Sequence, residues 1–442
     1  MLARIYFAVW LLACLPAWCQ ETTNTEADKQ SEDQSQLQVP PPVSGQAYET
    51  SFEGVTESNY LRGGITFTGA YSSNVYFGTT PIGDMSYSVW PTISLDKTTY
   101  RTHFTLNYAP GFTVYQRTTS LNQADQNFSA DLQYRLSPNL TATLTEGFQK
   151  MSNIFNQPNP LAAAAVSGGI PLSNVAVVSP IADMITNSST AQLNYQVGAD
   201  SMIGGSGNYN TLTYPNPEQV TGLYNSRSAG ASFFYSTRIH DRSYLGATYQ
   251  YQNYLSFQTN LPSTESKIQT IFLFYTLYLN PNWSISIEGG PQHYSSTQGL
   301  LPTAAAWQPM TMVSMSWRNE RNSFAGSYSR AVSGGGGLSG TFNSNNVAAS
   351  YNRQVSKDWT AGASASYANY QSLTPMFLYA TTNGHLLAGT VSLQRTFQSY
   401  MNFQFGYSWT QQSYTDIQSL KNNPNMNRVF VSLNFTFAKP LQ

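Results

Sequence analysis

The feature that most constrains this chain is an alternation of apolar and polar residues with a period of two, which begins near Gly63 and continues to the C-terminus. One segment has apolar residues at every second position, namely Phe128, Ala130, Leu132, Tyr134 and Leu136. Successive side chains of a β-strand point to opposite faces, so this spacing indicates strands with one apolar and one polar face. The spacing does not fit a helix. We therefore predict an all-β chain.

The composition indicates where the apolar faces go. Mean hydropathy is −0.31, and no apolar run is long enough for a membrane-spanning helix. Aromatic residues make up 14% of the chain and charged residues only 10%, whereas charged residues are about 25% of an ordinary soluble domain. Few charges and many aromatics on alternating strands are typical of a transmembrane β-barrel, whose strands face lipid on one side and water on the other.

The alternating segments predict an antiparallel barrel of eighteen strands, with sixteen as the alternative. The predicted strands are 63–72, 84–95, 99–109, 126–136, 140–150, 189–197, 201–212, 227–239, 243–254, 266–279, 283–293, 308–317, 322–331, 343–355, 359–371, 385–397, 400–411 and 427–437. Short turns such as 137–139 alternate with longer connections such as 333–341. Outer-membrane barrels have this asymmetry, with tight periplasmic turns and long external loops.

The N-terminus predicts export from the cytoplasm. Residues 1–19 have a short basic start, an apolar run of signal-peptide length and small residues before a cleavage point after Cys19. The alternative is a lipid-attachment signal ending at Cys14. Because Cys14 and Cys19 are the only cysteines, cleavage after Cys19 leaves a mature chain without disulfides.

Residues 20–61 form a separate region before the barrel at 62–442. They carry eight acidic residues and one lysine, with three consecutive prolines at 40–42. Such a composition cannot bury a core and predicts a disordered periplasmic leader, either a spacer or a docking segment for a periplasmic partner. The charge balance does not suggest nucleic-acid binding.

The last predicted strand carries a more specific pattern. Its alternating apolar residues are Val429, Val431, Leu433, Phe435 and Phe437. This run resembles the C-terminal signal of bacterial outer-membrane proteins, although residues 438–442 follow Phe437 here. Aromatic residues also gather at both ends of the strands, as expected at the two membrane interfaces.

With these features, residues 63–437 resemble porin-like outer-membrane barrels. The resemblance implies residence in the bacterial outer membrane, contact with its lipid and insertion by the barrel-assembly machinery. A homo-oligomer is a further option. Eighteen strands leave an open lumen, and the inward faces are expected to carry mainly Ser, Thr, Asn, Gln and Gly. The candidate pore-lining charges are Arg101, His103, Asp131, Arg135 and Glu288. Such a lining predicts a water-filled channel with weak ion selectivity.

A long connection at 151–188 is apolar in its middle, where Leu161, Val166 and Ile170 lie, and its only charged residue is Asp183. It is the third predicted external loop. In general porins the third loop folds into the lumen, so the resemblance implies a constriction here. An external cap and a subunit contact are the alternatives.

The predicted strand at 266–279 is apolar on both faces between Ile271 and Leu279. If Leu273 and Leu277 face out, the opposite face needs a dry partner. The folded-in loop, another subunit or a sugar-stacking surface would each serve.

Nothing in the sequence points to catalysis. None of the four histidines lies in a nucleophile motif or at metal-ligand spacing, so we predict no enzymatic activity, metal or cofactor. The predicted function is passage of small hydrophilic solutes through the outer membrane. The alternatives are the outer-membrane conduit of a polysaccharide or other polymer export system, and a structural barrel.

Overall fold

The computed structural model describes residues 59–151, 182–216, 222–258, 261–299, 303–373, 383–398, 400–415, 417, 420 and 422–441. The predicted signal peptide and almost all of the predicted leader lie outside the described residues. Leu161, Val166 and Ile170 lie outside them as well. None of the described segments is a helix long and apolar enough to cross a bilayer.

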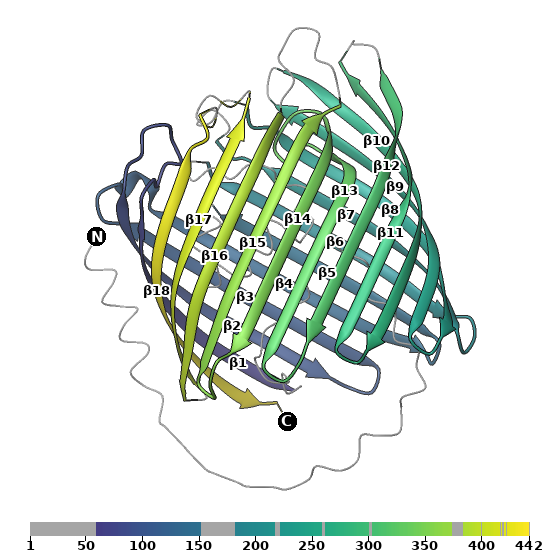
Figure 1. The fold of residues 1–442 in the computed structure, drawn as a ribbon, viewed down its shortest axis with the longest axis horizontal. Helices are drawn as coiled ribbons and strands as arrows, with labels where there is room; N and C mark the ends of the chain where they lie inside the picture. The colour runs from purple at the N-terminus through teal and green to yellow at the C-terminus, as the bar shows by residue number, and fades with distance from the viewer. Residues whose placement is uncertain are drawn as a thin grey trace, which may run out of the picture. The chain divides into compact units, whose positions relative to one another are not determined.

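The described chain forms one closed sheet of eighteen antiparallel strands (Figure 1), which confirms the predicted fold and strand number. The strands are β1 Tyr60–Ser72, β2 Asp84–Thr98, β3 Thr102–Tyr115, β4 Gln123–Ser137, β5 Leu140–Met151, β6 Met184–Gln196, β7 Ser201–Thr213, β8 Asn225–His240, β9 Ser243–Gln258, β10 Leu261–Asn280, β11 Trp283–Gln298, β12 Ala304–Arg318, β13 Asn322–Gly334, β14 Thr341–Gln354, β15 Trp359–Ser372, β16 Asn383–Gln398, β17 Met401–Tyr414 and β18 Asn425–Pro440. A single 3₁₀ turn, Thr119–Leu121, precedes β4.

The barrel closes where its first and last strands meet. β1 pairs with β2 on one side and with β18 on the other. In the closing ladder Leu433, Phe435 and Phe437 lie opposite Phe67, Ile65 and Gly63. The strand carrying the predicted C-terminal signal therefore forms the seam of the barrel.

The two faces of each strand differ as the period of two requires. On β1 the outward side chains of Phe67 and Tyr71 are 44% and 46% exposed, whereas the inward Thr66 and Thr68 are buried. Inward hydroxyls bond across neighbouring strands, as Thr68 does with Ser432 at 2.8 Å and Ser206 with Ser232 at 2.8 Å. The barrel thus has an apolar outer surface, suited to lipid, and a hydroxyl-rich inner wall.

Several strands extend farther than predicted at the end of the barrel that carries the long connections, here called the loop end. β6 begins at Met184 and β12 at Ala304, where the sequence predicted starts at 189 and 308. Residues 304–307 are all apolar, and residues 184–188 are two apolar residues followed by three polar ones, so the alternation that marks a strand is absent from both extensions.

Candidate functional site

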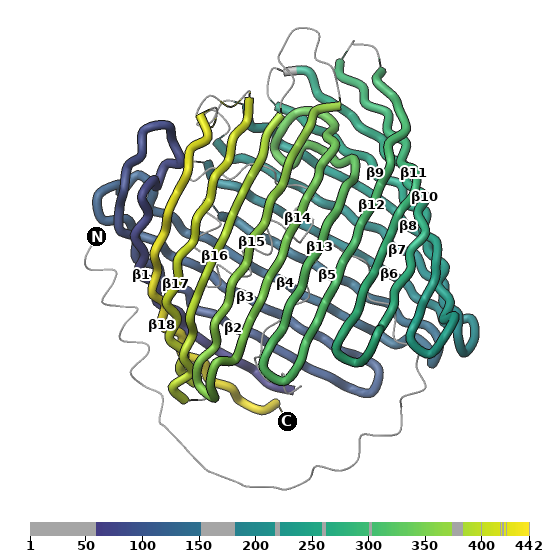
Figure 2. The backbone as a smooth tube through the Cα atoms, in the orientation of Figure 1, coloured from purple at the N-terminus to yellow at the C-terminus, as the bar shows by residue number. Residues whose placement is uncertain are grey.

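The wall of the barrel divides near the loop end. β12 and β13 pair from the short turn that joins them up to Thr311 and Arg330, and beyond that pair they part (Figure 2). β12 continues along β11 as far as Ala304, opposite Ser296. β13 instead remains paired with β14 as far as Gly334 and Thr341. We call the Thr311–Arg330 pair the fork.

Beyond the fork, the end of β13, the glycine-rich connection and the start of β14 turn into the lumen. We call residues 331–341 the inner tip. Val332 packs against Tyr254, Ile268 and Tyr294, which come from the inner faces of β9, β10 and β11. Every residue from Gly334 to Thr341 is buried. The predicted loop at 333–341 is therefore not an external loop but a plug against the inner wall.

A few polar contacts hold the inner tip to the wall. The side-chain amide of Gln292 on β11 accepts from the backbone N–H of Val332 at 2.7 Å and donates to its carbonyl at 3.3 Å. The hydroxyl of Thr341 lies 2.5 Å from that of Ser266, and the hydroxyl of Ser339 lies 3.3 Å from that of Thr264. The wall thus offers hydrogen-bonding side chains where a paired strand would offer its backbone.

Glycine lets the inner tip approach this closely. A Cβ at Gly334 would lie 2.5 Å from the ring of Tyr254, so even alanine would collide with it. The chain then reverses in a turn closed by a 2.9 Å bond from the Leu338 N–H to the Gly335 carbonyl. Its central residues, Gly336 and Gly337, have φ of 52° and 100°, angles that glycine adopts readily and that suit a tight hairpin turn.

The inner tip also joins an apolar cluster that spans the loop end of the lumen. Leu338 and Phe342 lie in the same cluster as Tyr214 and Leu223, from the β7–β8 connection, and Tyr414, from β17. The ring centres of Tyr414 and Tyr370 lie 6.5 Å apart, and Tyr214 belongs to the same cluster although β7 and β17 are far apart around the barrel. The remaining members are Phe77, Met151, Ala182, Met184, Leu212, Ala368, Leu386, Ile417, Leu420 and Met426. This cluster joins side chains from strands and connections far apart around the barrel, at its loop end.

Tyr214 is a member of this cluster that comes close to the inner tip. The N–H of Tyr224 donates to the carbonyl of Gly337 at 2.8 Å, and the Tyr214 hydroxyl would lie 2.4 Å from a Cβ on that glycine. Within the described part of the chain, this buried hydroxyl has no hydrogen-bond partner. Burial raises the pKa of the Tyr214 phenol above its ordinary range, because an ionised oxygen would lose its hydration there.

Asp84 fixes two loop-end connections to each other. Its side chain is fully buried and accepts from the backbone N–H groups of Met85, Arg117 and Thr118 at 2.8, 3.0 and 2.8 Å. The Thr118 hydroxyl adds a bond of 2.7 Å, and the Arg117 guanidinium lies 3.5 Å away. A carboxylate with this many donors makes a rigid joint between the β1–β2 and β3–β4 connections.

The predicted pore-lining residues occupy several different positions. His103, Asp131 and Arg135 lie at positions on β3 and β4 that alternate with outward apolar residues. His103 is 3.5 Å from Asp96, and Asp131 accepts from Thr145 at 2.7 Å. Arg101 lies instead in the β2–β3 turn, with its guanidinium 5.1 Å from the ring centre of Tyr100.

Glu288 is buried on the inner face of β11, opposite Phe274 on one side and Met312 on the other. The structure therefore gathers three of the five predicted charges on the β3–β4 wall, and it places Glu288 on the wall that receives the inner tip. Glu288 lies among the apolar residues that carry the tip.

Of the residues singled out in the long loop, only Asp183 is described. Its carboxylate lies 3.8 Å from Lys150. β5 ends at Met151 and β6 begins at Met184, so both ends of the predicted loop belong to strands. Met151, Ala182 and Met184 are members of the apolar cluster of the loop end.

The structure shows apolar residues that cover the inner face of β10, the strand predicted to be apolar on both faces. Phe272 and Phe274 face inward and pack with Met310, and Met312 and Ala331 lie against this group. Ala331 belongs to the inner tip, so part of the β10 surface is covered by the plug. The sequence left three occupants open for this face and did not include the glycine-rich connection among them.

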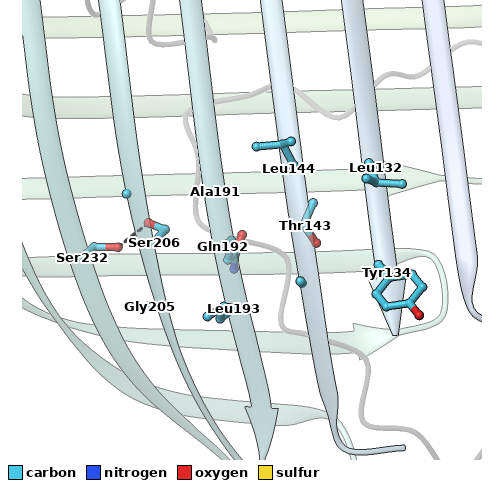
Figure 3. A pocket seen from close by; sticks show the side chains of 12 residues that line it. Leu132, Tyr134, Thr143, Leu144, Ala191, Gln192, Leu193, Gly205, Ser206 and Ser232 are labelled. Carbon is cyan, nitrogen blue, oxygen red and sulfur yellow. Dashed lines mark hydrogen bonds between the residues drawn. The ribbon is translucent and has the colours of Figure 1, made fainter. Parts of the chain in front are cut away.

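A shallow depression lies elsewhere, over strands β4–β8 (Figure 3). Its lining includes the outward apolar side chains of Leu132, Tyr134, Leu144 and Leu193, next to Gly205 and Gly207. It is separate from the closed loop end. Within the described ranges, no group of three or more His, Cys, Asp or Glu side chains could hold a metal ion.

Comparisons with known proteins show similarity of fold only. No protein-family model matches the chain, and no curated protein matches it. Solved structures that resemble it include the siderophore receptor PirA from Pseudomonas aeruginosa, with 11% identity, coverage of 87% of this chain and 81% of that one, and a TM-score of 0.41. OccK2 (OpdF), also from Pseudomonas aeruginosa, has 12% identity, coverage of 85% and 98%, and a TM-score of 0.43.

The ferric-catecholate import receptor Fiu from E. coli K12 has 9% identity, coverage of 87% and 82%, and a TM-score of 0.43. At these values the likeness carries no inference about what this chain binds or transports. The predicted resemblance to porin-like barrels is confirmed at the level of the fold, by the closed sheet itself.

Proposed function

We propose that this protein is an outer-membrane pore for small hydrophilic solutes, and that its loop-end mouth is closed by the inner tip and opens when the tip withdraws. One observation carries the proposal. A wall lined with hydroxyl pairs, suited to water and polar solutes, ends at a plug held by a handful of polar side-chain contacts and by apolar packing, with no strand pairing to the wall behind it. Contacts of this kind can break without loss of the barrel's strand pairing.

The setting supports a transport role rather than a catalytic one. The exposed apolar outer face fits a lipid bilayer, and the C-terminal strand fits insertion by the barrel-assembly machinery. The predicted leader would lie on the periplasmic side in this arrangement, and a periplasmic partner for residues 20–60 belongs to the same proposal. The buried tip favours a gated pore over a permanently wide conduit for polymers.

A disulfide across the plug tests the proposal. The variant S266C/T341C joins the inner tip to β10 through two side chains whose oxygens lie 2.5 Å apart, and the described residues contain no other cysteine. We expect oxidised protein in planar bilayers to be almost silent and reduction to restore channel openings. The matched control is S284C/S316C, which joins the neighbouring strands β11 and β12 through side chains 2.6 Å apart.

In the control, oxidation is expected to leave conductance unchanged. Equal conductance of oxidised and reduced S266C/T341C would show that the tip does not gate the lumen. If neither variant nor the unmodified protein shows channel openings, the result counts against a pore.

A further inference from the structure

Beyond the fork, no strand among the described residues pairs with the edge of β12 that faces β13. Residues 304–310 pair with β11 on one side. Within the described part of the chain, no strand pairs with their other side and no backbone hydrogen bond reaches it. A free strand edge offers a row of backbone donors and acceptors and is a ready surface for another extended strand.

The direction of the neighbouring hydrogen bonds shows which residues face this free edge. Arg318 N donates to Asn282 on the β11 side, whereas Asn319 N donates to Asn322 across the β12–β13 turn. Backbone groups alternate sides along an antiparallel strand. Odd-numbered residues of β12 therefore point toward β13, and Ala305, Trp307 and Pro309 face the free edge.

The same alternation applies to β13. The carbonyl of Asn322 accepts across the turn from β12, so the backbone groups of the even-numbered residues of β13 point toward β12, and those of Val332 are among them. Continuing the register past the fork would bring Val332 opposite Pro309 and Gly334 opposite Trp307. In the structure, however, the Val332 backbone is bonded by the Gln292 side chain. Gln292 thus takes the place that β12 would have if the ladder continued.

Pro309 explains why the side chain is preferred over the strand. Proline has no backbone N–H, so a Val332–Pro309 pair would leave the carbonyl of Val332 without its ladder donor. Gln292 supplies both a donor and an acceptor. The pairing of β12 with β13 therefore ends just before a position where only one of the two backbone hydrogen bonds could form.

From these relations we infer that the free edge of β12 is the binding surface for residues 331–335 of this chain once they leave the lumen. The inner tip moves as a hairpin, because β14 stays paired with β13 up to Gly334 and Thr341. β13 then pairs with β12 in the register set by the fork, which we call the zipped arrangement, and the hydroxyl contacts at Ser266 and Thr264 are released. The inference rests on the proposed function and describes how that pore opens.

Cysteine pairs distinguish the two arrangements. Gln308 and Ser333 would be opposite each other only in the zipped arrangement, at a pair whose backbone groups point away from each other and whose Cα atoms come closest. The variant Q308C/S333C should therefore form a disulfide in membrane vesicles and then hold the channel open. The reactivity control is M312C/S329C, a pair already opposite each other below the fork.

A second variant tests whether Gln292 holds the inner tip in the lumen. Adding Gln292→Leu to Q308C/S333C removes the side chain that replaces the ladder, and we expect the rate of disulfide formation to rise about tenfold. An unchanged rate would contradict the role given to Gln292 and with it the zipping.

The outcomes separate this inference from the pore itself. If Q308C/S333C fails to link while M312C/S329C links fully and the protein conducts, the zipping is overturned and the pore stands. If Q308C/S333C links but no variant conducts, the proposed pore fails and the pairing surface stands.

Discussion

Gln292 bonds both polar backbone groups of Val332, at 2.7 Å through its side-chain oxygen and 3.3 Å through its nitrogen. A single side chain on the barrel wall thereby takes the place of a paired strand for one residue of the plug. Because Gln292 is held by the β11 ladder independently of this contact, its side chain can be changed while the barrel remains folded.

We predict that Gln292→Leu opens the pore more often. The change leaves the buried N–H and carbonyl of Val332 unpaired, and each such group costs roughly 1–3 kcal/mol. A difference of about 1.4 kcal/mol alters an equilibrium tenfold. Single-channel recordings should show a corresponding rise in open probability. Gln250→Leu, on the inner face of β9, is the control and should have little effect; a closed Gln292→Leu channel would contradict the role of the amide.

Gly334→Ala should also displace the inner tip, through crowding. The added Cβ would lie 2.5 Å from the Tyr254 ring, which cannot compress. Replacing the ring in the double variant Gly334→Ala/Tyr254→Leu should restore most of the closure, measured as open probability. Gly207→Ala is the control, since its nearest neighbour would be 3.9 Å away. Failure of the double variant to restore closure would mean that the two residues do not meet in the closed pore.

Closure should weaken at high pH because of Tyr214. Its pKa is raised by burial, so its contribution to the closed arrangement is complete below the ordinary phenol value of about 10 and is lost as the pH rises above it. Open probability should therefore begin to increase above about pH 10 and continue to rise with pH. Tyr214→Phe should show a smaller increase, without loosening closure at neutral pH, because the hydroxyl has no partner to lose. An identical pH response in both proteins would exclude Tyr214 as the titrating group.

Asp84→Asn should loosen the loop end without unfolding the barrel. The asparagine nitrogen would face backbone N–H groups that now donate to a carboxylate oxygen, such as those of Arg117 and Thr118. We expect faster proteolysis of the 116–122 connection and an unchanged heat-modifiable band on gels. A protease pattern like that of the unmodified protein would argue against Asp84 as the joint.

The barrel was predictable because its determinants are local. An alternation such as Phe128 to Leu136 sets the strand, its two faces and its place in the sheet within a few residues. The even strand number and the closing role of the segment ending at Phe437 follow from the same pattern. Strand starts were placed too late at the loop end, where uniformly apolar residues, as at 304–307, or successive apolar and polar runs, as at 184–188, replace the alternation.

The plug was not predictable in this way, because its determinants are distant in sequence. Glycines at 334–337 carry no period and resemble any exposed loop, and their burial depends on Tyr254 and Tyr214 far away in the chain. For the partner of Phe272 and Phe274 the sequence leaves the long loop, another subunit and a sugar-stacking surface open, whereas the structure places Ala331 there. A run of glycines directly after a strand, opposite a strand apolar on both faces, was the available hint.

The long loop and the inner tip make separable contributions, and deletions should reveal them. Replacing residues 335–339 with a short turn removes Leu338 from the closing cluster and the Ser339 contact with Thr264, so the pore should open more often at an unchanged maximal conductance. Deleting about residues 158–182 tests the predicted constriction by the long loop and should raise the conductance of each opening and admit larger sugars. If that deletion instead dissociated oligomers, the loop would be a subunit contact. If both deletions raised open probability alone, the long loop would belong to the plug and would not set the channel width.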